Sequence, residues 1–355
     1  MSVSIFALIV VLGVLIFFHE LGHFLVARLF GVGVERFSLG FGPKLFGKTI
    51  GITDYRISAI PLGGYVKMVG EEPDAELDPE DIPISFTHQH VFKRILIVAA
   101  GPIFNFLLAV IIFFGIFQFS GLLILKPVIG EVKEDTPAHR GGIQKGDRIQ
   151  AIDGLTVESW EDMAKIITAS SGRPLTISVR RGESGLVVTV VPELKTFKNI
   201  FDEDIERYVI GVTASGEVFS KELTLLQAFS ESLIQTYNIT TLTLKSVVKL
   251  IQGTLSPKTL GGPIMIAQMA GQQAKEGMAN LIFFIALISI NLAILNFLPI
   301  PVLDGGHLVF FFIEALTGRP VSVRVREISQ QAGIFVLILL MIYVFYNDIT
   351  RVFFS

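Results

Sequence analysis

The residues with the clearest chemistry are two histidines and a glutamate in the run His19-Glu20-Leu21-Gly22-His23. On a helix His19 and His23 are four residues apart, so both imidazoles project from one face and can hold one zinc ion. Glu20 lies beside them, close enough to polarise a water molecule at the metal. The simpler interpretation is a membrane helix capped by polar residues, but a cap needs neither two histidines nor a glutamate at this spacing.

This motif lies inside an apolar stretch, because residues 2–18 carry no charge and apolar residues resume at 24–27. Ionisable side chains in such a segment are costly unless they face a cavity and function there. The chain is 51% hydrophobic and 17% charged, whereas soluble domains carry about 25% charged residues. It has no cysteine, so any zinc site must use histidine and carboxylate. The sequence thus predicts zinc-dependent hydrolysis inside a membrane.

A catalytic zinc usually takes three protein ligands, and Asp304 is the candidate for the third. Pro299 and Pro301 cannot continue a regular helix, and Gly305-Gly306 free the backbone after the aspartate. Irregular backbone at membrane depth is tolerated only where protein or water surrounds it. Asp304 could instead be a turn residue in an ordinary exit loop, but the histidine pair favours a metal ligand. His307 is expected to support the ligands or to begin a helix.

Four hydrophobic segments are long enough for a membrane span of about 20 residues. They lie near 4–26, within 95–125, at 280–298 and near 331–346. Lysine and arginine are frequent in the loops between the first two spans and between the last two, so the positive-inside rule places both loops in the cytoplasm. Both termini and the long central segment are then extracytoplasmic. A net charge of −3 gives no reason to expect a nucleic acid partner.

The central segment 126–194 alternates like a soluble β-rich domain. We expect a helix at 160–170, with Ser159 as its N-cap, and strands at 128–132, 148–152, 175–179 and 186–191. The turn sequence at 137–154 resembles the signature of a bacterial PDZ domain, which captures peptides at a sheet edge. A generic small β domain is the alternative. Residues 195–278 are expected to form a linker and amphipathic helices at the membrane surface, one of them within 223–255.

Alternating residues from Tyr55 to Ile60, followed by Pro61-Leu62-Gly63-Gly64, predict a β-hairpin whose turn is at 61–64. An edge strand that contains Gly63, Gly64 and Tyr65 could hold a substrate in extended form by main-chain hydrogen bonds. The alternative is that the hairpin only covers the cytoplasmic face of the metal site.

Together these motifs resemble the site-2 protease family of intramembrane zinc metalloproteases, of the bacterial regulator-of-sigma-E protease type. The resemblance covers nearly the whole chain and also includes Gly40–Pro43, Gly101-Pro102 with Asn105, and Leu260–Ile264. It implies that His19, His23 and Asp304 bind Zn²⁺ and that Glu20 is the general base.

The resemblance also implies that Asn291 and Asn296, on the third span, contact the unwound substrate backbone. These two residues are five apart, or about 140° around a helix, so they cannot both face one point. One of them is therefore free to serve packing between helices, where asparagine often forms hydrogen bonds.

The expected fold is a multi-span α-helical membrane protein, with about four transmembrane helices, a membrane-associated β-hairpin and one inserted extracytoplasmic PDZ (α+β) domain. Residues 1–125 and 279–355 would form the two catalytic membrane parts. Many relatives of this type have two tandem PDZ domains, so their two-domain gating cannot be transferred intact to a chain with one.

The expected function is cleavage of single-span proteins in the bilayer of a bacterial cytoplasmic (inner) membrane. By resemblance, the substrates are anti-sigma factors already cut outside and remnant signal peptides. A non-enzymatic zinc-binding transporter or PDZ scaffold is the rival class. A transporter should show inverted repeats, and the sequence shows none. A scaffold without catalytic activity should have lost Glu20 or a ligand residue, and all of them are present.

Overall fold

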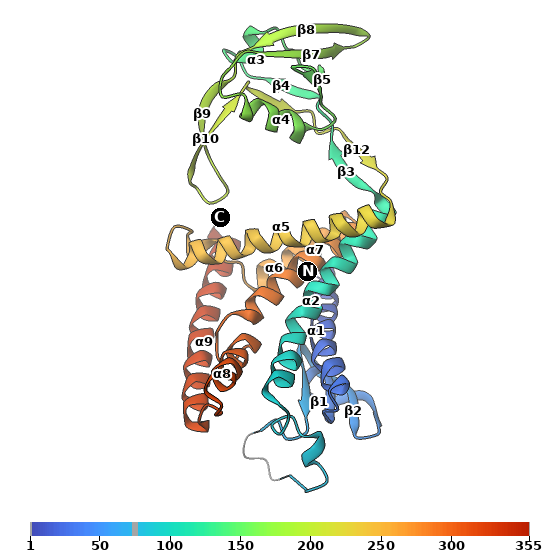
Figure 1. The fold of residues 1–355 in the computed structure, drawn as a ribbon, viewed down its shortest axis with the longest axis vertical. Helices are drawn as coiled ribbons and strands as arrows, with labels where there is room; N and C mark the ends of the chain where they lie inside the picture. The colour runs from blue at the N-terminus through green and yellow to red at the C-terminus, as the bar shows by residue number, and fades with distance from the viewer. Residues whose placement is uncertain (1, 73–76, 355) are drawn as a thin grey trace. The chain divides into compact units, whose positions relative to one another are not determined.

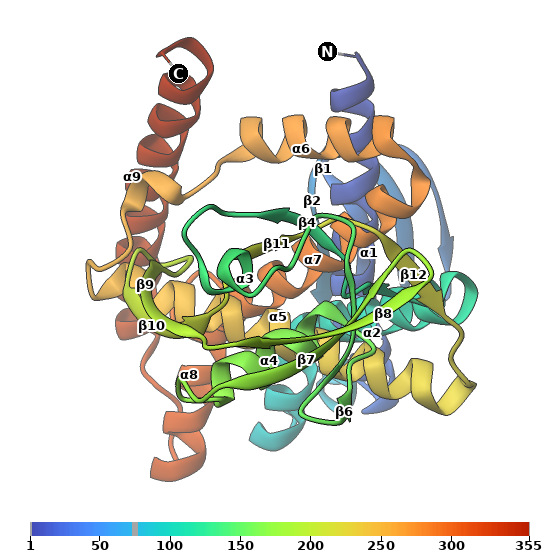
Figure 2. The same ribbon diagram turned by 90° about the horizontal axis from the view of Figure 1, so that it is seen from above.

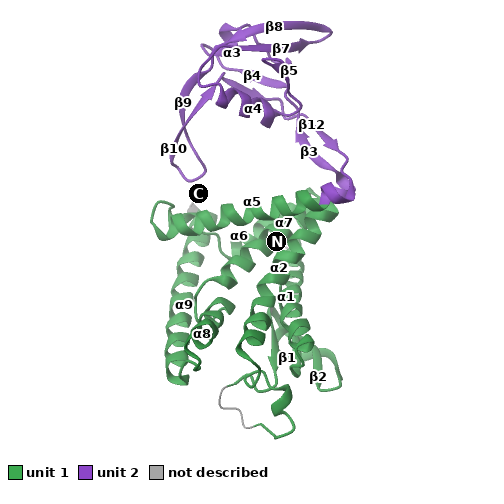
Figure 3. Ribbon diagram, viewed as in Figure 1, with its two compact units in different colours: residues 1–116, 229–355 green, residues 117–228 purple. Residues whose placement is uncertain are grey.

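The computed structural model describes residues 2–72 and 77–354, which divide into two compact units. The first, here called the membrane unit, comprises Met1–Ile116 and Phe229–Ser355. The second, here called the inserted unit, comprises Phe117–Ala228 (Figure 3). The chain therefore leaves the membrane unit once and returns to it once.

Four helices of the described chain are long and apolar enough to cross a membrane. They are α1 (Ser2–Leu29), α2 (Val91–Ser120), α7 (Met278–Phe297) and α9 (Val323–Phe354). Each covers one of the four segments predicted from hydropathy, so the prediction of a membrane protein with about four spans is confirmed.

Three further helices belong wholly or mainly to the membrane unit: α5 (Leu225–Ile251), α6 (Pro263–Glu276) and α8 (Asp304–Thr317). The expected amphipathic helix is α5, which runs crosswise to α1 and α2 (Figure 1). Helix α6 lies within the segment 195–278, where helices were expected, but its bounds were not predicted. It contacts both α1 and α9, and Figure 2 shows it reaching from one toward the other. The short 3₁₀ helices Ile82–Ile84 and Pro257–Thr259 lie in the connecting loops.

The predicted hairpin is present, but its turn is not at 61–64, so that part of the prediction is wrong. The strands are β1 (Val34–Ile50) and β2 (Thr53–Met68), joined at Gly51, whose φ of +61° suits a tight turn. Gly63 and Gly64, which were predicted to be turn residues, instead allow neighbouring side chains to lie close to the backbone of β2. A Cβ on Gly63 would lie 2.1 Å from the Phe41 ring, and one on Gly64 would lie 2.6 Å from Ile16.

The pairing of β1 with β2 makes the end of β2 an edge strand. Residues 34–39 of β1 pair with 64–68 on one side and with 54–57 on the other. A turn at 61–64 would require segments 54–57 and 64–68 to pair with each other. They do not, because residues 34–39 lie between them. Segment 64–68 forms its ladder with β1 alone among the described residues, so its second edge is left for other partners.

The inserted unit is built around a four-stranded antiparallel sheet in the order β6-β5-β7-β8. Its strands are β5 (Arg148–Ile152), β6 (Leu155–Thr156), β7 (Leu175–Arg181) and β8 (Ser184–Val190). Two helices accompany them, α3 (Pro137–Arg140) and α4 (Trp160–Ala169). A capping box between Ser159 and Asp162 begins α4, which confirms the predicted start of this helix.

Three two-stranded pairs extend this unit beyond the expected segment 126–194. Strand β4 (Ile129–Val132) pairs with β11 (Val212–Ala214), and β3 (Leu122–Leu125) pairs with β12 (Val218–Lys221). Strands β9 (Glu193–Lys198) and β10 (Asp204–Val209) form a hairpin. Because Ile210 is part of the same buried core as Ile129 and Ile149, the unit needs residues well past 194 to close.

Candidate metal centre

His19 and His23 on α1 meet Asp304, the first residue of α8. His19 Nε2 lies 3.2 Å from Asp304 Oδ2, and His23 Nε2 lies 3.6 Å from Asp304 Oδ1. The two Nε2 atoms are 3.3 Å apart. One ligand atom from each residue thus falls within 4.8 Å of the other two, so the three residues predicted from sequence are brought together.

The break between α7 and α8 delivers Asp304 to the histidines. Helix α7 ends at Phe297, before Pro299 and Pro301, which lack the amide hydrogens that a helix needs. The loop then folds tightly onto itself. A Cβ on Gly305 would lie 2.2 Å from the Leu298 carbonyl oxygen, and one on Gly306 would lie 2.4 Å from that of Ile300. The glycines after Asp304 are therefore required for a tight loop.

Helix α2 supports the two imidazoles from the other side. His23 Nδ1 donates a hydrogen bond to the Ile97 carbonyl oxygen at 2.9 Å, which directs Nε2 toward Asp304. At the crossing of α1 and α2 a Cβ on Gly22 would lie 2.4 Å from the Ala100 oxygen. A Cβ on Gly101 would lie 2.2 Å from His23 Nε2. Both glycines allow the helices to approach closely enough to fix the rings.

Two imidazole nitrogens and a carboxylate oxygen are the donor set of a catalytic zinc that keeps one position open. Asp304 Oδ2 supports this assignment, because it is buried and makes no hydrogen bond within the described chain. Its side chain is only 19% exposed, and those of His19 and His23 are 12% and 11% exposed. The residues present therefore fit a zinc ion.

Glu20 lines the same cavity, of about 230 Å³, as the three ligand residues. A Cβ on Gly64 would lie 2.9 Å from Glu20 Cγ, so the edge of β2 is in direct contact with this side chain. The backbone amide of Val66 hydrogen-bonds the Glu20 carboxylate. Glu20 is thus beside the ligand cluster without being part of it, which is the position that a general base needs.

The predicted substrate-binding residues of the hairpin are divided by the structure. Gly64 and Tyr65 line the cavity, as does His307, whereas Gly63 faces Phe41. The cavity also has walls that the sequence did not predict: Met68, Glu71, Phe86, Val98, Phe311 and Arg326. None of these residues has a local motif, so only the tertiary structure could identify them.

Neither Asn291 nor Asn296 lines this cavity. Asn291 Oδ1 accepts a hydrogen bond from the Thr243 hydroxyl of α5 at 2.8 Å. Asn291 therefore joins two helices, which agrees with the expectation that one of the pair serves packing. Contact of Asn296 with a substrate stays a prediction.

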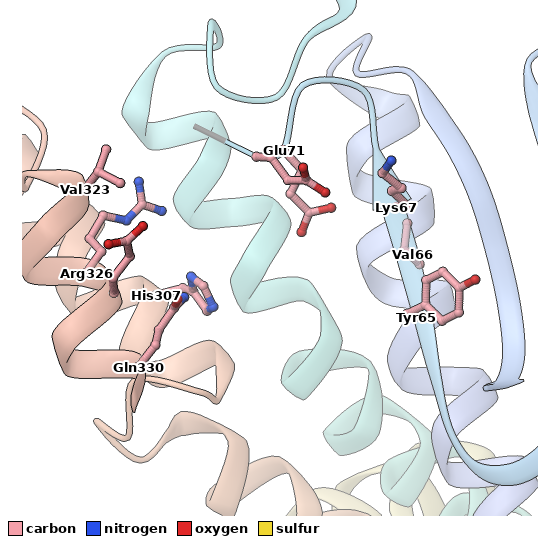
Figure 4. A pocket seen from close by; sticks show the side chains of 10 residues that line it. Tyr65, Val66, Lys67, Glu71, His307, Val323, Arg326 and Gln330 are labelled. Carbon is pink, nitrogen blue, oxygen red and sulfur yellow. The ribbon is translucent and has the colours of Figure 1, made fainter. Parts of the chain in front are cut away.

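A second cavity, of about 520 Å³, adjoins the metal cavity and shares five of its lining residues: Tyr65, Val66, Glu71, His307 and Arg326. Figure 4 shows Tyr65–Lys67 and Glu71 on one side of it, with His307, Arg326 and Gln330 across from them. The edge of β2 runs along both cavities, so an extended chain could follow it from one to the other.

Comparison with known proteins is consistent with this geometry. The family model described as "Peptidase family M50" matches residues 7–340. A protein of Agrobacterium fabrum named "Putative zinc metalloprotease" is 37% identical over 359 residues, which cover 96% of this chain and 94% of that protein. A protein of the same name from Campylobacter jejuni is 37% identical over 354 residues, which cover 99% and 94%.

A third relative with that name, from Rickettsia conorii, is 35% identical over 359 residues and 99% of both chains. Among solved structures, a PDZ domain from Listeria monocytogenes is 22% identical over 24% of this chain and 84% of that one, with a TM-score of 0.20. That score is too low to establish a shared fold.

Proposed function

This chain belongs to peptidase family M50 and is a zinc metalloprotease, and we propose that it cleaves single-span membrane proteins within or near the bilayer. The observation that carries the proposal is the position of the ligand cluster. His19 and His23 lie in the second half of α1, a helix long and apolar enough to cross a membrane, and Asp304 follows α7, which is another. A peptide bond that reaches this cluster has to come from within a membrane segment or its border.

The chemistry assigned to the chain itself centres on Glu20. When bound, Zn²⁺ supplies a Lewis acid for activating water and polarising the scissile carbonyl. Glu20 takes a proton from the attacking water and delivers it to the leaving amine. His19, His23 and Asp304 hold the ion, and the Ile97 carbonyl orients His23.

Substrate presentation is assigned to the free edge of β2. Val69 N donates to the Gly33 carbonyl, so odd-numbered amides of this segment face β1 and even-numbered amides face away. In agreement with this alternation, Val66 hydrogen-bonds Glu20, and Met68 N donates to Glu71 Oε2 at 3.1 Å. A substrate that pairs with this edge is unwound from its helix and lies beside the catalytic glutamate.

The physiological substrates proposed from the family resemblance are anti-sigma factors after an outer cut, and remnant signal peptides. The positive-inside rule supports placing the loop 30–90 and the segment between α7 and α9 in the cytoplasm of a bacterium, with both termini and the inserted unit outside. A PDZ-like inserted unit in that position cannot take part in bond breaking. Its proposed task is selection of substrates.

Cleavage of a purified single-span test protein by the full-length chain, in detergent or liposomes, tests the proposed function. We expect a product whose new terminus, located by mass spectrometry, falls within or beside the span. A zinc chelator should stop the reaction, and added Zn²⁺ should restore it. Cleavage confined to soluble regions of the substrate, or cleavage insensitive to chelator, contradicts the proposal.

The selection role is tested by removing residues 122–221 of the inserted unit. Leu122 pairs directly with Lys221, so a short Gly/Ser bridge can join the two ends. Zinc binding should persist, and substrates that still carry a bulky outer domain should now be cut. If the unit recruits substrates instead, the deletion slows cleavage of trimmed substrates too. Unchanged discrimination between trimmed and untrimmed forms contradicts a size filter.

A further inference from the structure

Helix α2 presents a row of three residues to the two metal-binding histidines. Ile97, Gly101 and Asn105 follow one another at intervals of four and so lie on one face of the helix. Ile97 provides a carbonyl oxygen for His23 Nδ1. Gly101 provides space, because a Cβ there would also lie 2.8 Å from His19 Cε1. Asn105 is the third member of the row, and the zinc site as described gives it no task.

Asn105 is fully buried, with 0% of its surface exposed. Its amide nitrogen Nδ2 lies 3.4 Å from His19 Nδ1. The amide oxygen Oδ1 is buried as well and has no hydrogen-bond partner in the part of the chain that the structure describes. An unpaired amide oxygen in the interior is costly, and here it belongs to a side chain in contact with a metal ligand.

The tautomer of His19 gives that oxygen a partner. His19 Nε2 faces Asp304 and His23, so a metal held at this point requires the ring proton to be on Nδ1. Nδ1–H is then a hydrogen-bond donor, and an amide NH₂ group cannot accept a hydrogen bond from it because that group is also a donor. A half-turn of the Asn105 amide exchanges its oxygen and nitrogen within almost the same volume. The oxygen then lies opposite Nδ1–H.

We infer that Asn105 is a positioning residue of the zinc site: its amide oxygen accepts a hydrogen bond from His19 Nδ1–H and holds Nε2 toward the ion. Both histidines are then oriented from α2, His23 by a backbone carbonyl and His19 by a side chain. This role depends on the zinc site alone and not on which substrate is cut. Outer partners of this kind typically change metal affinity about 10- to 100-fold.

The test is the zinc affinity of the purified full-length protein, measured by competition with a chromophoric chelator. Asn105→Leu keeps the approximate size of the side chain but removes the acceptor, and we expect it to weaken zinc binding about 10- to 100-fold. Asn105→Asp keeps an acceptor and should stay within a few-fold of wild type. Ser289→Ala is the matched control. The Ser289 hydroxyl donates to the backbone oxygen of Asn105 at 2.8 Å, so this variant disturbs the same place without touching the amide.

Zinc affinity of Asn105→Leu equal to wild type overturns the inference, as does an equal loss in Ser289→Ala. Should Asn105→Leu fail to fold, ¹⁵N-histidine NMR of the zinc-loaded wild type decides the question. We expect the proton of His19 to be on Nδ1, slow to exchange with solvent, and its exchange to be faster in Asn105→Ala. A His19 that binds zinc through Nδ1, or exchange unchanged in Asn105→Ala, contradicts the assigned role.

Discussion

Each unit of this protein contains an aspartate with a buried carboxylate oxygen next to cationic or imidazole side chains, and the two aspartates differ in the hydrogen bonds that they accept. Asp147 of the inserted unit is 0% exposed and accepts hydrogen bonds from Arg181 Nε and Nη2, each at 2.8 Å. The backbone amide of Gln144 adds a third, at 2.8 Å. Asp304 of the membrane unit has one buried oxygen without any hydrogen bond in the described chain.

Burial within the membrane unit does not explain this difference, because Asp348 of α9 is 1% exposed and well satisfied. Its carboxylate accepts hydrogen bonds from the backbone amides of Gly262, Ile264 and Met265 at 2.9, 2.9 and 3.1 Å. A carboxylate that only stabilises the fold is satisfied by its own chain. The buried Oδ2 of Asp304, which has an imidazole nitrogen at 3.2 Å but no hydrogen bond among the described residues, is therefore best explained as a metal ligand, whereas Asp147 and Asp348 hold structure together.

Asp304→Ala should have the largest effect and should separate these two kinds of aspartate. Removal of one of three ligands should abolish stoichiometric zinc and, with it, cleavage. Because Asp304 makes few hydrogen bonds of its own, the metal-free variant should unfold at nearly the temperature of metal-free wild type. Zinc content by atomic spectroscopy and thermal unfolding after dialysis against chelator check both statements. One full equivalent of zinc in the variant removes Asp304 from the ligand set.

Val66→Pro should lower cleavage strongly while leaving zinc bound. Proline removes the amide that faces Glu20 and prevents the edge of β2 from pairing with a substrate. Val66→Ala keeps the amide and is the matched control. We expect a loss of tenfold or more for proline, roughly the effect of one lost main-chain hydrogen bond, and little change for alanine. Normal cleavage of every test substrate by Val66→Pro would mean that the hairpin is only a cover.

Asp147→Asn should have the smallest effect on activity and should act only on the inserted unit. Loss of hydrogen bonds to a charged partner should destabilise that unit by about 1.5–3 kcal/mol. Hydrogen–deuterium exchange of the full-length protein should be faster in peptides from Phe117–Ala228 and unchanged around His19. Faster exchange in α1, or loss of zinc, would contradict the separation of the two units.

The same aspartate predicts a pH dependence. Burial raises the pKa of the Asp147 carboxyl. The hydrogen bonds from Arg181 and the Gln144 amide together lower it by more than burial raises it, so the pKa lies below its ordinary value. The stabilisation is therefore complete above the unfolded pKa of about 4 and is lost as the pH falls through the folded pKa. The protection factors of the inserted unit, which correct for the slower intrinsic exchange in acid, should therefore fall as the pH falls for wild type, and this contribution should be missing in Asp147→Asn.

Local signals in the sequence predicted much of the fold and the centre of the site. The four membrane-spanning helices follow from uninterrupted hydropathy, and the two histidine ligands follow from a spacing that places both on one helix face. Pro299 and Pro301 correctly marked the end of α7. In each case the residues that determine the feature are close together in the chain.

The failures have one physical cause, which is that contacts distant in sequence decided the outcome. Gly63-Gly64 read as a turn because the sequence cannot distinguish a glycine needed for a positive φ from one needed for close packing. The contacts of Ile97, Gly101 and Asn105 of α2 with the histidines, and the position of Arg326 in the cavity wall, depend on how helices distant in sequence pack together. The bounds of helix α6 were not predicted because its polar residues hide a face that packs on α1, where a Cβ on Gly271 would lie 2.2 Å from Ser4 Oγ.

The assignment of catalysis to Glu20 beside three zinc ligands is tested most directly by Glu20→Gln, with cleavage and zinc content measured on the same preparation. Glutamine keeps the shape but cannot accept the proton of water, so cleavage should fall by about 10²- to 10⁴-fold. Zinc should stay at the wild-type stoichiometry, unlike in Asp304→Ala. Cleavage close to the wild-type rate with zinc fully bound would contradict the assignment.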